Sequence, residues 1–136
     1  MKQFRVKIIT PFGQYFDNDV DYLEVRANHS VLGILPGHAP LVSTLLISKM
    51  RIRINNAVFT YAIGGGIIYV KEDQTILLLD SVENASDIDI DRALRALERA
   101  KARLDEKDES IDVARVYSAI NRATNRINLY NEFNKK

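Results

Sequence analysis

Hydrophobic and polar residues alternate along the first part of the chain in short runs that end at turn residues. Residues 4–8 alternate apolar with basic side chains before a turn at 11–13, and residues 50–54 repeat the pattern before Asn55 and Asn56. Alternation with a period of two is typical of a strand with one buried face. Both runs are therefore predicted to be half-buried strands.

The runs that follow Asn56 are rich in β-branched and aromatic residues and succeed one another with short turns. Such residues favour strands, and turns of this length join antiparallel neighbours. No stretch with a helical period separates these runs. The pattern predicts an antiparallel β-sandwich over residues 1–84. Gly64-Gly65-Gly66 is predicted to form a turn or bulge with positive φ, and no Gly-Lys-Ser/Thr follows that would indicate a phosphate-binding loop.

After Glu83 the period changes to three and four residues, which is typical of amphipathic helices. Ser86 followed by Asp89 fits the start of a helix, with the hydroxyl capping an amide. The sequence "DEKDES" interrupts the pattern and predicts a polar turn. We therefore expect an α-helical hairpin over residues 87–133, and an α+β fold in two parts. The predicted packing stripes are Ile90, Ala93, Leu97, Ala100 and Leu104 on the first helix, and Val113, Val116, Ile120, Ala123, Ile127 and Tyr130 on the second.

Composition excludes several classes of function. The chain has no cysteine, which removes thiolate catalysis, iron–sulfur ligation and disulfides. Its two histidines lack regularly spaced acidic partners, so no metal site is predicted. The net charge of +1 disfavours a general nucleic-acid binder, and the apolar runs are far shorter than the roughly 20 residues of a membrane-spanning helix. No nucleophile lies in a recognisable triad context, and we expect no enzymatic activity.

The arginines of the predicted hairpin fall into two groups when neighbours three and four positions away are compared, because such neighbours face each other on a helix. The arginines that have an acidic residue at this spacing can be explained as ordinary solvated pairs. They are Arg92, Arg95, Arg103 and Arg115. Arg99, Arg122 and Arg126 have none, and Arg122 and Arg126 face each other.

Two interpretations of Arg99, Arg122 and Arg126 remain open from the residues alone. Exposed arginines are common and cost little, so the three can be unrelated surface residues. Alternatively, the two helices bring them together on a polyanion, because guanidinium groups match phosphate and carboxylate oxygens. A nucleoside triphosphate and an acidic protein surface would both fit.

The order of motifs along nearly the whole chain resembles the epsilon subunit of bacterial F-type ATP synthases. "VLGILPGHAPLVSTL" (31–45) resembles a characteristic loop and strand of that family. "GGGIIYV" (64–70) and "ILLLDSVENASDIDIDRA" (76–93) resemble its last strands and the entry into its helical hairpin. The resemblance implies a non-catalytic rotor subunit of a proton-translocating synthase, located at the cytoplasmic face of the bacterial plasma membrane and peripheral to it.

In that family the sandwich docks on the gamma subunit and on the membrane rotor c-ring. The hairpin either folds or extends towards the catalytic alpha/beta subunits, where it inhibits ATP hydrolysis. The resemblance implies no required cofactor, with ATP as a regulatory ligand of the folded hairpin. It implies no nucleic-acid partner and no direct membrane insertion. A free-standing ATP-binding sensor is the alternative, and co-purification with a gamma-like protein would separate the two. A hydrolase ranks third, because it predicts phosphate release by the isolated chain.

Some family members bind ATP through an Ile/Leu-Asp-x-x-Arg-Ala motif with further arginines. By resemblance, the nucleotide-binding residues here are Glu83, Ile88, Asp89, Arg92, Ala93, Arg99, Arg122 and Arg126. Asp89 is expected to accept hydrogen bonds from the adenine amino group or from neighbouring backbone. Asp91 also lies inside the motif, where a second carboxylate would weaken the binding of an anion.

Overall fold

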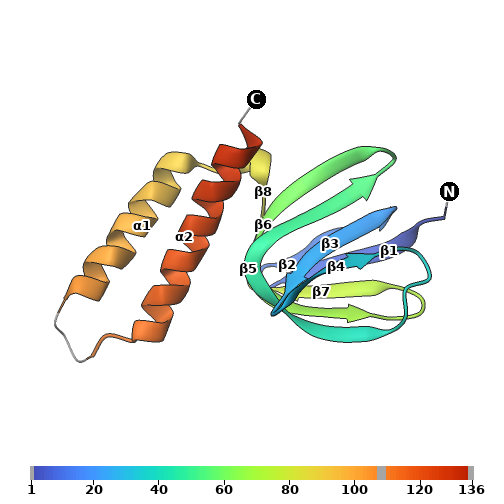
Figure 1. Ribbon diagram of the computed structural model, residues 1–136, viewed down its shortest axis with the longest axis horizontal. Coiled ribbons are helices and arrows are strands. Elements are labelled where there is room, and N and C mark those ends of the chain that lie inside the picture. The colour runs from blue at the N-terminus through green and yellow to red at the C-terminus, as the bar shows by residue number, and fades with distance from the viewer. Residues whose placement is uncertain (1, 107–109, 135–136) are drawn as a thin grey trace. The chain divides into compact units, whose positions relative to one another are not determined.

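The computed structural model describes residues 2–106 and 110–134, which belong to two compact units, Met1–Asn84 and Ala85–Lys136. The first unit contains the described strands and the second the described helices (Figure 1). The predicted α+β fold, a β-sandwich followed by a helical hairpin, is confirmed. The strands are β1 (Phe4–Thr10), β2 (Gly13–Val20), β3 (Tyr22–Ala27), β4 (Ser30–Ile34), β5 (Leu41–Ile54), β6 (Ala57–Val70), β7 (Thr75–Leu79) and β8 (Val82–Asn84).

Hydrogen bonds connect the strands in the order β2-β1-β7-β6-β5-β3-β4, and β8 pairs with β6. The pairs are antiparallel except β1 and β7, which run parallel with Val6 opposite Thr75. The prediction of a wholly antiparallel sandwich is wrong at this pair. Only strands joined by a tight turn must run antiparallel, and β1 and β7 are far apart in the sequence.

The bend in β6 lies at Gly64, Gly65 and Gly66, where φ is +90° at Gly65 and +152° at Gly66. At this point the partner of β6 changes from β8 to β7, while its pairing with β5 keeps one register. The positive φ predicted for these glycines is confirmed. The glycines allow the two long strands, β5 and β6, to contribute to both layers of the sandwich.

Alternating side chains of these strands form one apolar core. The largest fully buried side chains include Ile8 on β1, Leu23 on β3 and Leu77 on β7. On β5 the buried residues Met50 and Ile52 alternate with exposed Arg51, as the sequence pattern predicts. The core is large enough to stabilise the sandwich without the hairpin.

A buried carboxylate fixes the turn between β5 and β6. Asp21, which is only 5% exposed, accepts hydrogen bonds from the backbone N–H of Asn55 at 2.7 Å and from the side chain of Gln3 at 3.0 Å. Asn55 and Asn56 both have positive φ, as a tight hairpin turn of this hand requires. The turn predicted at these asparagines is confirmed, and its anchor at Asp21 could not be seen in the sequence.

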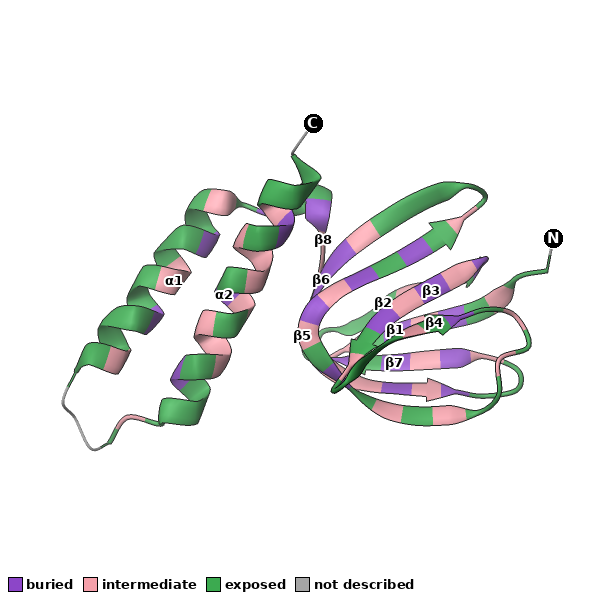
Figure 2. Cartoon of the chain, in the orientation of Figure 1, coloured by how far each residue is buried: buried purple, intermediate pink, exposed green. Residues whose placement is uncertain are grey.

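The helical unit consists of a short 3-10 helix, η1 (Ala85–Asp87), and two α-helices, α1 (Ile90–Asp105) and α2 (Val113–Phe133). Both α1 and η1 pack against α2. Residues 107–109 of the predicted polar turn lie outside the described residues. Figure 2 shows buried positions recurring along both α-helices.

Gly66→Ala should disrupt the bend in β6. A Cβ atom at Gly66 would collide with the carbonyl oxygen of Leu78 on the neighbouring strand. At Gly37, where φ is +82° and nothing lies within 4 Å, alanine would meet only backbone strain. We expect Gly66→Ala to lower the free energy of unfolding by at least ~3 kcal/mol, and Gly37→Ala by ~1 kcal/mol. Urea denaturation would measure both, and equal effects would contradict the proposed collision.

Tyr61 should make the sandwich sensitive to high pH. It lies in the core, and burial raises its pKa above 10.0, with the nearby Tyr15 ring adding a smaller effect. Below pH 10 the phenol is neutral in the folded and the unfolded chain, so its contribution to stability is constant. Above pH 10 the unfolded chain ionises first, and stability falls as pH rises through the folded pKa.

Tyr61→Phe should therefore lose less stability than the natural chain between about pH 9 and about pH 11. Urea denaturation at both pH values would test this. The same loss in both proteins would show that ionisation of Tyr61 is not linked to unfolding.

Candidate functional site

Helix α1 is capped by a residue of the predicted nucleotide motif. The carboxylate of Asp89 accepts a hydrogen bond from the backbone N–H of Arg92 at 3.1 Å, and its carbonyl accepts one from Ala93 at 3.0 Å. The prediction that Ser86 starts the helix is wrong, since Ser86 lies in η1 and α1 starts at Ile90. The backbone turns once through η1 before the helix begins, and an aspartate three residues later is an equally good cap.

Small and branched side chains form the seam between α1 and α2. Ala93 and Ala100 are the buried residues of α1, and Ala123 is the most buried residue of α2. Val116 is also buried, whereas Val113, predicted to lie in the same stripe, is 51% exposed. Val113 is the first residue of α2, and the predicted stripe fails there.

Antiparallel packing fixes the height of each arginine along the hairpin. Arg92 precedes the end of α1 by 13 residues (105 − 92), and Arg126 follows the start of α2 by 13 (126 − 113), so both lie at about the same height. Arg122 is 9 residues from the start of α2, and Arg99 is 6 residues from the end of α1. At 1.5 Å per residue, these four arginines lie within about 10 Å along the helix axes.

The same packing fixes the side of the hairpin to which the arginines belong. With about 100° per residue, Arg92 and Arg99 lie about −100° and −120° from Ala93 on α1. Arg122 and Arg126 lie about −100° and −60° from Ala123 on α2. Antiparallel helices wind in opposite senses when seen from one end. Rotations of the same sign from the seam therefore lead to the same face of the hairpin.

Two further arginines lie on this face although the sequence analysis did not select them. Arg103 and Arg115 are each 2 residues from the helix ends at the turn (105 − 103 and 115 − 113), and each lies about −80° from the seam. We call the surface formed by these six residues the arginine face: Arg92, Arg99, Arg103, Arg115, Arg122 and Arg126. The signal that could have revealed Arg103 and Arg115 was their rotation relative to Ala93 and Ala123.

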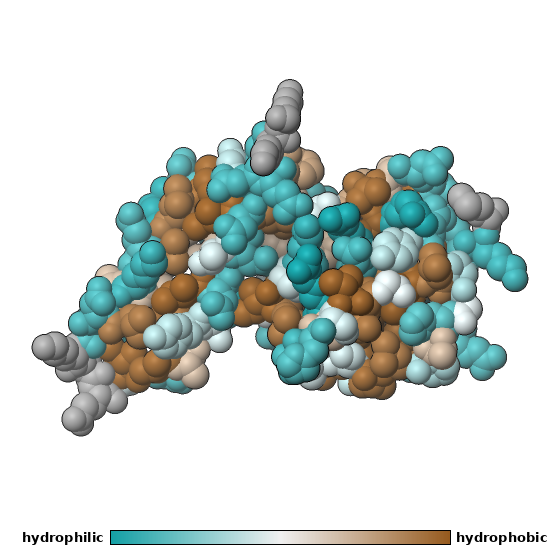
Figure 3. All heavy atoms as spheres, viewed as in Figure 1, coloured by the Kyte–Doolittle hydropathy of each residue, from teal (hydrophilic) through white to brown (hydrophobic). Residues whose placement is uncertain are grey.

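The opposite face of the hairpin is more apolar. Leu94 lies about +100° from Ala93, and Tyr117 about +120° from Ala123, and the two are 43% and 50% exposed. Hydrophobic side chains accordingly appear over both helices in the space-filling view (Figure 3). The hairpin is thus basic on one side and partly apolar on the other.

The sequence suggested ion pairs for Arg92, Arg95, Arg103 and Arg115, but none of them forms an ion pair with a described residue. All four side chains are exposed, where such pairs contribute only ~0–1 kcal/mol. Arg99 and Arg122 likewise form no ion pair within the described part of the chain. Arg126 is half-buried and does have an interaction partner. Much of the charge of the arginine face is therefore available to an external anion.

The remaining predicted site residues are not on the arginine face itself. Ile88 and Ala93 are 6% and 3% exposed, so they support the start of α1 from within. Asp89 is exposed at the helix terminus. Glu83 belongs to the sandwich unit, where it lies on β8 opposite Ala62. The hairpin thus brings the motif residues 88–93 and the arginines into one unit, and Glu83 lies outside it.

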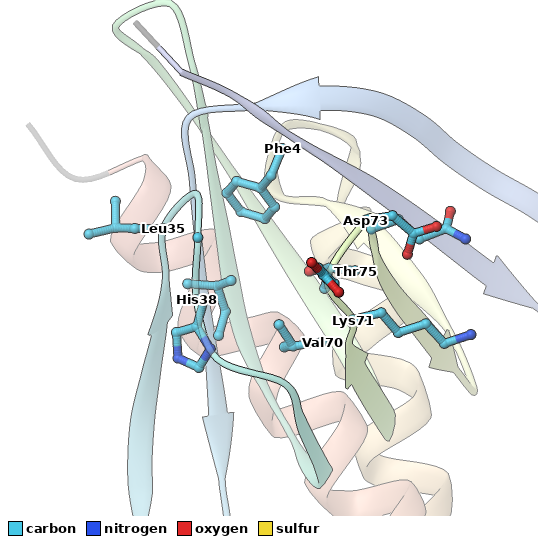
Figure 4. A pocket seen from close by; sticks show the side chains of 11 residues that line it. Phe4, Leu35, His38, Val70, Lys71, Asp73 and Thr75 are labelled. Carbon is cyan, nitrogen blue, oxygen red and sulfur yellow. The ribbon is translucent and has the colours of Figure 1, made fainter.

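A small cavity of about 30 Å³ in the sandwich offers no comparable chemistry. It lies between the loop around His38 and the β6–β7 turn (Figure 4). His38 Nδ1 lies 2.6 Å from the carbonyl oxygen of Ala39, which confirms the structural hydrogen bond predicted for this histidine. Among the residues that the structure describes, no cluster of metal-ligating side chains is found. The cavity has room for little more than a water molecule.

Asp89→Ala should weaken the start of α1, because the Arg92 N–H would lose its acceptor. We expect hairpin stability to fall by ~1 kcal/mol with alanine and by only a few tenths of this with Asp89→Asn, since asparagine caps equally well. Hydrogen exchange at the Arg92 amide would report the change. Equal protection in the natural chain and both variants would show that the cap does not stabilise the helix.

Two family models match the chain in the order of its two units. The β-sandwich domain of the ATP synthase delta/epsilon chain matches residues 3–85, and the long α-helix domain of the same chain matches residues 86–131. None of the described helices is both long and apolar enough to cross a membrane.

Individual proteins support the same assignment. The ATP synthase epsilon chains of Bacillus velezensis and Halalkalibacterium halodurans are each 39% identical over 129 and 130 residues, covering 95% of this chain and 98% of theirs. A chain of the Euglena gracilis mitochondrial ATP synthase shares the fold, with a TM-score of 0.76, 20% identity, and coverage of 90% of this chain and 78% of that one. A chain of the Tetrahymena thermophila mitochondrial ATP synthase central stalk and c-ring gives a TM-score of 0.60 at 17% identity, covering 97% and 96%. The chain therefore belongs to the ATP synthase delta/epsilon family, whose epsilon chains are non-catalytic subunits.

Proposed function

We propose that this chain is a central-stalk subunit of a proton-translocating F-type ATP synthase whose hairpin responds to ATP. The sandwich couples the catalytic head to the membrane rotor ring, and the hairpin inhibits ATP hydrolysis when it extends. ATP binds the folded hairpin and holds it in the non-inhibitory form. The subunit needs no cofactor for folding, and ATP acts as a regulatory ligand.

The observation that carries the proposal is the arginine face. Arg92 and Arg99 come from α1, and Arg122 and Arg126 from α2, so the four lie together only while the helices are packed. An anion that contacts both helices binds the folded hairpin more tightly than the open one. Ligand linkage then stabilises the folded form by about 1.4 kcal/mol when the ligand is at ten times its Kd.

Charge repulsion makes this coupling stronger. Arg122 and Arg126 are four residues apart on one helix, and Arg92 lies at the height of Arg126 across the seam. Like charges at such spacing destabilise a helix by a few tenths of a kcal/mol each. A phosphate chain would remove this cost and accept charge-assisted hydrogen bonds from the guanidinium groups. The triphosphate fits the arginines, and the base fits the motif end near Ile88 and Asp89.

The partners are proposed from the surface of the sandwich and from the arginine face. Ile9 and Leu78 are neighbours on β1 and β7, and both are 36% to 40% exposed, while Val42 on β5 is 65% exposed. Exposed apolar side chains of this kind suit a protein partner, here the gamma subunit and the c-ring. In the extended form the arginine face would meet acidic surface of the catalytic alpha/beta subunits. These contacts would hold the chain peripherally at the cytoplasmic face of the bacterial membrane.

The comparisons favour this function over a free-standing ATP sensor. The similarity covers 95% of the chain and 98% of an ATP synthase epsilon chain, so both units are shared with a synthase subunit. A free-standing sensor would have no need for the sandwich. Co-expression with the gamma subunit would separate the two functions, because a free-standing sensor would purify alone.

Calorimetric titration with ATP tests the regulatory part. We expect saturable binding to the natural chain and at least a tenfold loss of affinity in the Arg122→Ala, Arg126→Ala double variant, which removes two phosphate ligands. The control is the Arg95→Ala, Lys101→Ala double variant, which loses the same charge. Arg95 and Lys101 lie about −160° and +80° from the seam, off the arginine face.

The control should keep its ATP affinity within a factor of about two or three, because it loses only long-range attraction. Equal losses in the two double variants would contradict a specific site. Absence of heat with the natural chain at millimolar ATP would overturn the regulatory proposal, and the arginine face would then be a contact surface for proteins.

A further inference from the structure

Asp91 stands out among the carboxylates around the motif because it has no evident structural use. It lies in the first turn of α1 and is exposed, and it makes no hydrogen bond or ion pair with any described residue. Asp89, two residues earlier, caps the helix through the Arg92 N–H. One carboxylate is sufficient for that cap, so Asp91 is an additional negative charge at the same helix terminus.

This charge lies close to the proposed anion. Asp91 precedes Arg92 directly, and 14 residues separate it from the end of α1 (105 − 91), against 13 for Arg92 and for Arg126 at their ends. It is therefore within about 2 Å of these two arginines in height. Arg99 is 8 residues further along, or about 12 Å. These separations are comparable to the Debye length of about 8 Å at physiological ionic strength, so a bound polyanion would feel the charge.

The direction of the effect follows from the rotation of Asp91 about the helix. It lies about −200° from Ala93, one residue step beyond Arg92 and away from the seam. At this angle its carboxylate cannot ligate an anion held on the arginine face, and it acts only through its field. The field repels phosphate and partly neutralises Arg92.

We propose that Asp91 lowers the affinity of the arginine face for ATP and so raises the ATP concentration at which the hairpin closes. This inference rests on the proposed function of the arginine face as a nucleotide site. It assigns to Asp91 the role of setting the operating range, without any contact with the ligand.

The test is calorimetric titration of the full chain and of Asp91→Asn with ATP, AMP and adenosine at about 0.1 M salt. Asp91→Asn should bind ATP about two- to fivefold more tightly, AMP less markedly so, and adenosine unchanged, because the gain scales with ligand charge. The gain for ATP should shrink at about 1 M salt, where the Debye length is about 3 Å. Asp91→Lys should tighten ATP binding further than Asp91→Asn.

Asp105→Asn is the matched control, since it makes the same substitution at the other end of α1. Asp105 is 6 residues, or about 9 Å, from Arg99 and about 20 Å from the height of Arg92, and it lies about +120° from the seam. It should change ATP affinity less than Asp91→Asn. Circular dichroism would confirm that the variants keep their helices.

The inference is overturned if the natural chain binds ATP and Asp91→Asn does not bind it more tightly, or if adenosine gains as much as ATP. A gain from Asp105→Asn as large as that from Asp91→Asn would also overturn it, since any loss of negative charge would then suffice. If none of these proteins binds ATP, the nucleotide site itself is wrong, and the role of Asp91 falls with it.

Discussion

The packing of α1 on α2 through small side chains is the constraint on which the hairpin's chemistry depends. Ala93, Ala100 and Ala123 bury little area, so the contact gives only modest stability at ~25 cal/mol per Å². The same contact fixes the angle and height of every arginine on both helices. A weak seam therefore determines a strong electrostatic feature, and anything that binds this feature also stabilises the seam.

The two units divide stability and response between them. The sandwich has a continuous apolar core, a glycine bend that lets β5 and β6 contribute to both layers, and a buried Asp21 that fixes the β5–β6 turn. The hairpin has a narrow seam and repelling guanidinium groups. Elements of low local stability are the ones that ligands can shift, because the free energy of binding is comparable to the free energy of opening. The structure thus places a stable docking domain beside a segment suited to switching.

Much of the fold was predictable because its signals are local. The alternation at residues 50–54, the turn at Asn55 and the helical stepping after Glu83 each reflect a backbone period that short segments carry. The parallel pairing of β1 with β7 was not predictable, because no local signal specifies the direction of strands far apart in sequence. The anchoring of the turn by Asp21 was missed for the same reason, since 34 residues separate Asp21 from Asn55.

The candidate site was predictable in part. The spacing of Arg99, Arg122 and Arg126 marked them as residues without an acidic neighbour on their own helix, which is a local property. Whether the two helices bring them to one face depends on the rotation about the seam, which only the packed hairpin gives. Arg103 and Arg115 were missed because an acidic residue lies at helical spacing from each, although neither forms an ion pair with a described residue. Sequence spacing shows which pairs are feasible, whereas packing and solvent decide which of them form.

The most direct test of ATP-dependent closure is the distance between two spin labels, one on each helix. The chain has no cysteine, so Leu94→Cys and Thr124→Cys would provide unique labels. Each is 11 residues from the helix end at the turn (105 − 94 and 124 − 113), and both lie about +100° from the seam, off the arginine face. Electron paramagnetic resonance should show a short distance whose population rises with ATP. A population that stays constant or falls as ATP saturates its site would contradict the account.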